Sequence, residues 1–341
     1  MLFRSEKEIM TNIGNMYGPN FTFLGIPACD LDKPETYKGA DVIIVGAPID
    51  SGTSHRSGAK FGPQAIRMGD YLPHDGERPH LALRIDGLKT LKIFDAGDLL
   101  MPPGNLEDSL AVLKAATEKI SQAGAIAVVL GGDHSIASAD VAGIAEHRGK
   151  GKISMVHFDA HADTGDLQFG ALVGHGTPMR RLIDSGYVRG DRFLQLGLRG
   201  YWPDDATLIW MRDQGMRSYE MTEIHHRGLK AVLDESFATL TKDCDGVFLS
   251  VDIDVVDPGM APGTGTPEPG GMTSRELLEA VRRICLELPV VGIDVVEVSP
   301  PFDSADITAI LANRVVLEAV SAIAKRKSGS SYSPTQNLLD R

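Results

Sequence analysis

Eight short apolar segments recur along the chain, and each is followed by a stretch of mixed apolar and polar residues. The segments are rich in Val, Ile and Leu and lack regular polar alternation, which is typical of strands buried on both faces. We therefore expect eight strands in a mostly parallel sheet. They cover residues 41–48, 91–98, 125–135, 152–161, 192–200, 216–221, 245–257 and 290–300.

Amphipathic stretches lie between these segments. Residues 106–124 and 273–288 have apolar positions at helical spacing, and Thr273 or Ser274 followed by Glu276 is a helix-capping signal. Strands that alternate with helices predict an α/β fold, a three-layer α/β/α arrangement with the sheet in the middle.

The length of 341 residues suits one large α/β domain or two small ones. No internal repeat or linker divides residues 41–327, so we predict one domain there. Residues 1–40 form an irregular N-terminal extension with room for one short helix. The polar residues 328–341 are expected to be a mobile tail.

Composition narrows the classes of partner. The formal charge of −12 argues against nucleic acid or an anionic membrane and suits a cationic small molecule. The three cysteines are widely spaced and form no C-x-x-C pair, so neither a disulfide framework nor a zinc ribbon is indicated. With no run of 18 apolar residues and no apolar leader, we expect a cytoplasmic protein with no membrane span.

Candidate chemistry begins with HFDAHADTGD, residues 157–166. Asp159, His161 and Asp163 occupy alternating positions, and alternating side chains of an extended chain point the same way. Two carboxylates and an imidazole that face one point need a positive charge between them. A lone Asp-x-Asp is more often a loop or a cap than a metal site, so the rest of the pattern matters.

Four of the apolar segments end in side chains of this kind. Ligands of open α/β sheets collect beyond the carboxyl ends of the strands, so these residues are expected to converge. Unpaired buried carboxylates are costly, and two divalent ions would neutralise the set. Mixed carboxylate and imidazole ligands favour Mn²⁺, Ni²⁺, Co²⁺ or Fe²⁺ over Ca²⁺, and such a pair of ions can share a hydroxide that attacks an electrophilic carbon. The residues are His134, Asp159, His161, Asp163, Asp252, Asp254 and Glu297.

At this point the chain resembles a known family, the ureohydrolases, which include arginases, agmatinases and guanidino-acid hydrolases. The similarity extends from about residue 40 to 325, and it favours the agmatinase-like branch. The motifs that carry the resemblance are GGDHS (131–135), DAHAD (159–163), SVDIDVVDP (250–258), APGTGTPEPGG (261–271), EVSP (297–300) and the segment 46–67.

The resemblance implies a role for each ligand. Asp159 and Asp252 would bridge two divalent ions, Ni²⁺ or Mn²⁺. His134 and Asp163 would complete one metal position, and His161 and Asp254 the other. A hydroxide that bridges the ions would cleave a C–N bond of a guanidino group and release urea, or guanylurea, and an amine.

It also implies the groups that act on the substrate. Asp163 would move the proton of the hydroxide to the departing amine, and His175 would shuttle protons at the mouth of the site. Glu297 would hold the guanidinium, and the Thr266 hydroxyl would line the pocket. For His175 the alternative is a histidine near a helix N-terminus without chemistry.

The substrate is less constrained. After DAHAD, residues 164–174 contain Phe169 and other apolar side chains but no evident clamp for an α-amino acid, which argues against arginine. Tyr201 and Trp202 are expected at the same rim, where they would cap a small cation by cation–π contact or else pack between subunits. We therefore favour compact guanidines or biguanides, namely guanidine, N-methylguanidines or metformin, for which the resemblance points to nickel.

Several alternatives stay open. A longer-tailed guanidine, agmatine or guanidinobutyrate, would use Asp166, or Arg180 and Arg181, for its distal charge. A metal-dependent deacetylase would need one metal and not two, and a scaffold subunit would normally have lost ligands. By resemblance we expect a homo-oligomer, a trimer or hexamer, or a hetero-oligomer with a paralogous subunit. Residues 1–40 would then be able to reach a neighbour's site.

Overall fold

The structure, a computed structural model, describes residues 21–70 and 79–339. Its eight strands form a single sheet in the order β2-β1-β3-β8-β7-β4-β5-β6, and every pairing is parallel. The predicted eight-stranded sheet is thus confirmed. The strands are β1 (Val42–Ala47), β2 (Ile93–Asp98), β3 (Ile126–Gly131), β4 (Ile153–Phe158), β5 (Val188–Leu198), β6 (Arg217–Glu220), β7 (Gly246–Asp252) and β8 (Val290–Val296).

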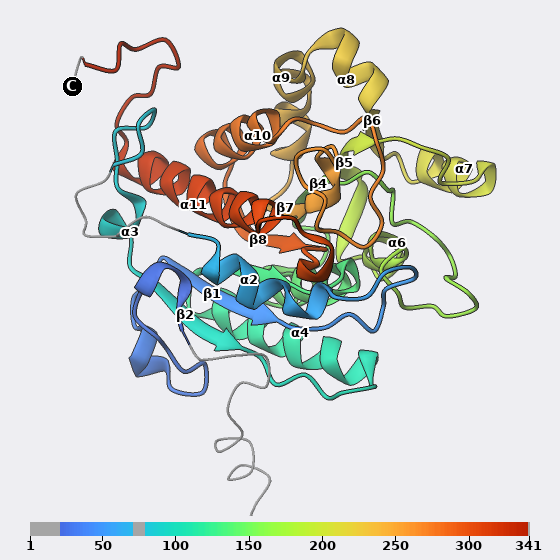
Figure 1. Cartoon of the computed structure of the whole chain (residues 1–341), viewed down its shortest axis with the longest axis horizontal. Helices are drawn as coiled ribbons and strands as arrows, with labels where there is room; N and C mark the ends of the chain where they lie inside the picture. Colours follow the sequence, from blue (N-terminus) through green and yellow to red (C-terminus); the bar gives the residue numbers. More distant parts are fainter. Residues whose placement is uncertain (1–20, 71–78, 340–341) are drawn as a thin grey trace, which may run out of the picture.

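Helices cover both faces of the sheet and complete the predicted three layers (Figure 1). One face carries α2 (Gly62–Met68), α8 (Met221–Arg227), α9 (Leu229–Leu240), α10 (Ser274–Glu287) and α11 (Ile307–Ser328). The other face carries α4 (Leu106–Gln122), α5 (Ala137–Arg148) and α6 (Pro178–Asp184). The short α3 (Gly87–Thr90) and α7 (Asp205–Asp213) complete the helices of the described residues.

Strand β1 shows why the strand segments are continuously apolar. Val42 and Ile44 pack into the core on the α11 face, whereas Ile43 and Val45 pack into the core on the α4 face. All six residues of β1 are buried. Alternate side chains of a strand point to opposite faces, so a sheet covered on both sides needs apolar residues at successive positions.

Helix α11 is long and apolar enough to cross a membrane by length and composition. However, 78% of its most apolar window is buried inside the fold. It packs against α10 and α2, and its contacts are those of a core helix.

The predicted start of one helix is confirmed, whereas the predicted end of one strand differs in the structure. Thr273 and Glu276 form the predicted capping box at the start of α10. By contrast, β4 ends at Phe158, so Asp159, His161 and Asp163 follow the strand instead of continuing it. The alternation argument for these three residues was therefore wrong. Asp163 has a φ of 52°, in the left-handed region, and the turn brings their side chains together where an extended chain would not.

The N-terminal extension is described only from residue 21, where two 3₁₀ turns follow, η1 (Phe23–Gly25) and η2 (Pro34–Tyr37). The short helix expected there has no counterpart among residues 21–40 other than these turns, and residues 1–20 lie outside the described part. Residues 329–339 follow α11 as irregular turns. Their mobility stays a prediction.

Candidate functional site

The candidate site lies at the carboxyl edge of the four central strands, β3, β8, β7 and β4, which are consecutive in the sheet. His134 begins the 3₁₀ turn η4 (His134–Ile136) just after β3, and Asp159 follows β4 directly. Asp252 is the last residue of β7, and Glu297 follows β8. Because parallel strands end at the same edge, residues far apart in the chain meet there.

The first group of side chains surrounds the imidazole of His134. Its Nδ1 lies 3.0 Å from Asp163 Oδ2, 3.1 Å from Asp159 Oδ2 and 3.2 Å from Asp252 Oδ2. It nevertheless has no hydrogen-bond partner and is buried. A nitrogen that faces three carboxylate oxygens without bonding to any of them is placed to share a cation with them.

A second group adjoins the first. His161 Nδ1 lies 3.1 Å from Asp254 Oδ2 and 3.4 Å from Asp159 Oδ1. One Asp159 oxygen therefore faces each imidazole, and Asp159 belongs to both of the groups whose ligand atoms are close enough to hold an ion. The six predicted ligands thus converge, and Asp159 lies between the two halves.

Backbone amides orient these carboxylates. The amide of His161 donates to Asp159 Oδ1 at 2.6 Å, that of Ala160 to Asp254 Oδ1 at 3.1 Å, and that of Asp254 to Asp252 Oδ1 at 2.8 Å. In Asp252 and Asp254 this leaves Oδ2 turned toward an imidazole. Charge-assisted bonds of this kind fix the carboxylates before any ligand arrives.

The electrostatics of the cluster call for positive charge. Burial raises the pKa of the Asp252 carboxyl well above its usual range, and the charges of Asp254 and Asp159 raise it further. Burial would lower the pKa of the His134 imidazole, yet the surrounding carboxylates raise it well above the ordinary value. Four carboxylates and two neutral imidazoles would carry a charge of −4, which two divalent cations balance. The donor set therefore fits a dinuclear site.

His157 was not predicted as a site residue from the sequence, although it lies two residues before Asp159, on the same side of the strand. Its Nε2 lies 2.8 Å from Asp159 Oδ2, and its Nδ1 lies 3.1 Å from the Gln195 amide nitrogen. That amide also donates to the Ala162 carbonyl at 2.7 Å, so Nδ1 of His157 is the acceptor and Nε2 carries the proton. His157 could be grouped with the ligands by distance alone, but this tautomer makes it a support for Asp159.

A series of hydrogen bonds that supports His134 was also not predicted from the sequence. His134 Nε2 lies 2.9 Å from Ser250 Oγ, and Ser250 in turn hydrogen-bonds Asp294. Asp294 also accepts from the Val251 amide at 3.2 Å and lies against the carboxyl of Asp140. This chain holds the His134 ring with Nδ1 toward the carboxylates.

His175 and Glu297 form a buried pair beside the cluster. His175 Nδ1 lies 3.0 Å from Glu297 Oε1, which also accepts from the His134 amide at 2.8 Å. Burial would lower the pKa of His175, but the Glu297 charge and hydrogen bond raise it to about 9. His175 Nε2 lies 2.6 Å from the Ser54 hydroxyl, another contact that the sequence did not reveal.

The second oxygen of Glu297 is the open position of the site. Oε2 is buried and has no hydrogen-bond partner in the described structure. A methyl group added at Gly265 would lie 3.5 Å from it, so the glycine leaves room beside this oxygen. Thr266 lies nearby in sequence, and its hydroxyl is 3.4 Å from Asp254 Oδ2. A buried, unpaired carboxylate oxygen with space beside it suits a cationic donor.

The predicted rim residues are exposed, unlike the residues of the buried cluster. Phe169, Tyr201 and Trp202 are 93%, 94% and 73% exposed. Their contact with a substrate stays a prediction. The charges considered for a longer substrate tail pair with one another, because Asp166 Oδ1 lies 3.4 Å from Arg180 Nε and 3.2 Å from Arg181 Nη2.

The model of the arginase family matches residues 40–321. Proclavaminate amidinohydrolase of Streptomyces clavuligerus is 37% identical over 94% of this chain and 98% of its own, and its solved structure superposes with a TM-score of 0.78, covering 91% and 99% of the two chains at 35% identity. Guanidinobutyrase of Pseudomonas aeruginosa is 34% identical over 93% and 98%. Formiminoglutamase of Trypanosoma cruzi, solved with two Mn²⁺ ions, is 25% identical over 90% and 100%, with a TM-score of 0.78.

Proposed function

The chain belongs to the arginase family of C–N hydrolases, and we propose that it cleaves the guanidino group of a small molecule that carries an aliphatic tail, releasing urea and an amine. The observation that carries the proposal is the buried, unpaired Glu297 Oε2 beside a cluster of four carboxylates and two imidazoles. This buried carboxylate oxygen can accept charge-assisted hydrogen bonds from a planar cation.

We propose that His134 and Asp163 would hold one divalent ion, that His161 and Asp254 would hold the other, and that Asp159 and Asp252 would contribute to both positions. When bound, such a pair of ions lowers the pKa of water and polarises the guanidino group. Mn²⁺ is the first choice because the Trypanosoma cruzi relative was solved with it, and Ni²⁺ is the second.

The chain's own residues supply the rest. Glu297 Oε2 binds a guanidinium N–H and fixes the plane of the group. The Asp163 carboxylate takes the proton of the attacking water and gives it to the departing nitrogen, so that water and a guanidino compound become urea and an amine. His175, held by Glu297 and Ser54, carries a proton beside the departing nitrogen.

The remaining question is which tail the guanidino group of the substrate carries. Guanidinobutyrase and agmatinase relatives are named for guanidines with a longer tail. We therefore rank guanidinobutyrate and agmatine ahead of the compact guanidines and metformin that the apolar loop at 164–174 favoured. The exposed Phe169, Tyr201 and Trp202 keep the compact class as the second candidate.

The test measures urea or amine release across a panel. Purified enzyme, loaded separately with Mn²⁺ and Ni²⁺, is assayed with guanidinobutyrate, guanidinopropionate, agmatine, guanidine, dimethylguanidine and metformin. We expect the highest kcat/KM with a tailed guanidine. Turnover confined to guanidine, dimethylguanidine or metformin would reverse the ranking.

A variant ties the activity to the site. Glu297→Gln keeps the size of the side chain and removes its charge, so we expect kcat/KM to fall at least 100-fold while metal content is unchanged. Activity equal to wild type in this variant would remove Glu297 from substrate binding. Native mass spectrometry on the same samples tests our proposal of a trimer or hexamer, and an inactive chain that is monomeric throughout would favour a hetero-oligomer with a paralogous subunit.

A further inference from the structure

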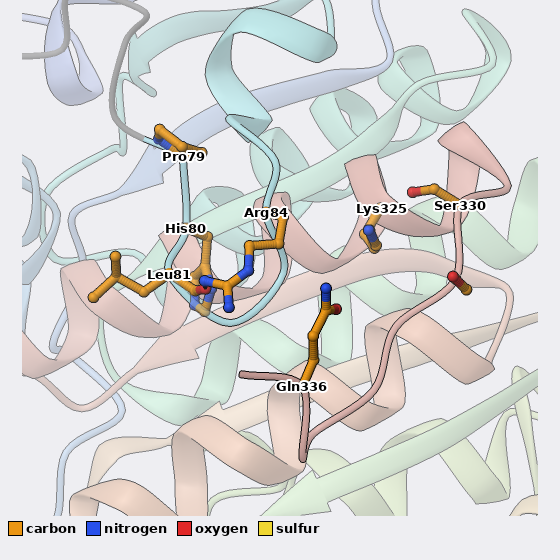
Figure 2. A pocket seen from close by; sticks show the side chains of 8 residues that line it. Pro79, His80, Leu81, Arg84, Lys325, Ser330 and Gln336 are labelled. Carbon is orange, nitrogen blue, oxygen red and sulfur yellow. Dashed lines mark hydrogen bonds between the residues drawn. The ribbon is translucent and has the colours of Figure 1, made fainter. Parts of the chain in front are cut away.

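A cavity lies far from the carboxylate cluster. It has a volume of about 400 Å³ and opens between the loop at residues 79–84 and the segment that follows α11 (Figure 2). The first turn of α11 is tied to the carboxyl edge of the sheet, where Thr308 Oγ1 accepts from the Gly263 amide. Lys325 comes 18 residues after Ile307, roughly 27 Å farther along the helix at 1.5 Å per residue. The cavity therefore lies at the opposite end of the molecule from the candidate active site. Its lining residues are Pro79, His80, Leu81, Arg84, Lys325, Ser330, Ser331 and Gln336.

The lining of this cavity is cationic. Two permanently charged basic side chains, Arg84 and Lys325, contribute to it, and no Asp or Glu does. Lys325 is only 7% exposed, and within residues 21–70 and 79–339 no hydrogen bond or ion pair is found for its Nζ. Two residues later, Lys327 Nζ pairs with Asp41 Oδ1 at 2.6 Å. Lys325 lines the cavity, so its ammonium can donate a charge-assisted hydrogen bond to an anion there.

Arg84 adds a second charge, which forms no ion pair within residues 21–70 and 79–339. Its two terminal nitrogens donate to neutral carbonyls, those of Leu81 and Asn337, and its Nε is buried without a partner. Arg84 also has a φ of 58°, in the left-handed region that non-glycine residues rarely adopt. Strain of this kind persists only where surrounding contacts enforce it.

Those contacts are present. His80 Nε2 lies 3.0 Å from Glu318 Oε2, and His80 Nδ1 accepts from the amides of Ala82 and Leu83, each at 3.1 Å. Glu318 in turn accepts from Arg282 Nε at 2.6 Å. The loop that carries Arg84 is thus bound to α11 through Glu318, and Glu318 in turn pairs with Arg282 of α10. In Figure 2 the head groups of Arg84, Lys325 and Gln336 come from three segments and border one space.

We propose that this cavity binds a phosphate group, either inorganic phosphate or the phosphate of a small metabolite. Two cations that form no ion pair among the described residues match a phosphate dianion better than a single carboxylate does, and the two serine hydroxyls add donors suited to a group with several oxygens. The volume leaves room for an organic part against Pro79 and Leu81. The net charge of −12 makes non-specific attraction of anions an unfavourable alternative.

Such binding would lock the C-terminal segment onto α11 and raise the stability of the folded chain by mass action. It requires no assumption about the reaction at the carboxylate cluster. The proposal therefore stands or fails independently of the proposed function.

Isothermal titration of the metal-loaded full-length protein tests the site, with inorganic phosphate, glycerol phosphate and acetate as probes. We expect saturable binding of either phosphate compound and at least tenfold weaker binding of acetate. Lys325→Met and Arg84→Met should each weaken phosphate binding at least tenfold. Lys327→Met is the matched control, because it removes a neighbouring charge that already has a partner, and it should bind phosphate like wild type.

Three outcomes would overturn the proposal. One is the absence of saturable phosphate binding. Another is equal affinity of wild type, Lys325→Met and Arg84→Met, which would place any bound phosphate at the metal centre. The third is acetate binding as tight as that of phosphate. Circular dichroism and metal content of both variants show whether they are folded, and having two variants keeps the test decisive if one is not.

Discussion

Asp140 and Asp294 meet beneath His134 with a geometry that makes a specific prediction. Both residues are fully buried, and each has an Oδ2 without a hydrogen-bond donor. Burial raises the pKa of Asp140 well above its ordinary value, and the charge of Asp294 raises it further. Asp294 accepts from Ser250 and Val251 and is better solvated by the protein. Asp140 is therefore the protonated partner and donates to Asp294.

Two substitutions separate this hydrogen bond from simple packing. In Asp140→Asn the amide nitrogen donates the same bond without a titrating proton, so the free energy of unfolding should stay within about 1 kcal/mol of wild type. Asp140→Leu keeps the volume and removes the donor. The unpaired Asp294 oxygen should then cost about 1–3 kcal/mol. Because the chain through Ser250 orients His134, metal affinity should also fall about 10–100-fold in the Leu variant.

The pH dependence has a definite sign. A carboxyl whose pKa is higher in the folded state than in the unfolded state stabilises the fold fully below the unfolded value, 3.8, and loses that contribution as the pH rises through the folded value. The asparagine lacks this proton. Wild type should therefore lose stability relative to Asp140→Asn as the pH rises above about 4.

The assay is urea denaturation of chelated protein at several pH values, followed by titration with Mn²⁺. Equal destabilisation by Asn and Leu would show that the hydrogen bond is not what matters at this position. A stability difference between wild type and Asp140→Asn that does not change with pH would refute the shared proton. Full metal affinity in Asp140→Leu would show that the hydrogen bonds through Ser250 and Asp294 do not support His134.

Three other substitutions probe the site and the fold. Asp252→Ala removes a carboxylate oxygen 3.2 Å from His134 Nδ1 and a proposed bridge, so elemental analysis should find metal lost from both positions; two ions per subunit would contradict the bridge. Gly265→Ala places a methyl group 2.9 Å from the Arg56 carbonyl, too close without a backbone shift, and 3.5 Å from Glu297 Oε2, so steady-state kinetics should show kcat/KM at least tenfold lower at unchanged metal content. Thr273→Ala breaks the capping box of α10 and should cost about 1 kcal/mol in chemical denaturation while kcat stays unchanged.

The strands and the candidate metal ligands could be predicted from the sequence for physical reasons. Strands covered on both faces must be apolar at successive positions, so β1 stands out without any structure. Buried acidic residues at the end of such strands or directly after it are costly unless they bind a ligand, which is why Asp159 and Asp252 were identified as candidates. The side chains that support these ligands could not be recognised from the sequence. His157 resembles an ordinary strand residue, and Asp140 lies within a helix, so only the folded chain shows what each contacts.

The wrong inference about HFDAHADTGD shows where the precision of the site originates. A continued strand would have used its amides in the ladder with β5 and β7, leaving none for the carboxylates. Because β4 stops at Phe158, the amides of Ala160 and His161 are free to hold Asp254 and Asp159. Asp254 comes from the neighbouring strand end, so its position depends on the order of β7 and β4 in the sheet. The same backbone groups that end the strand thus offset part of the repulsion among the carboxylates, and they fix the geometry in which two cations can balance the rest.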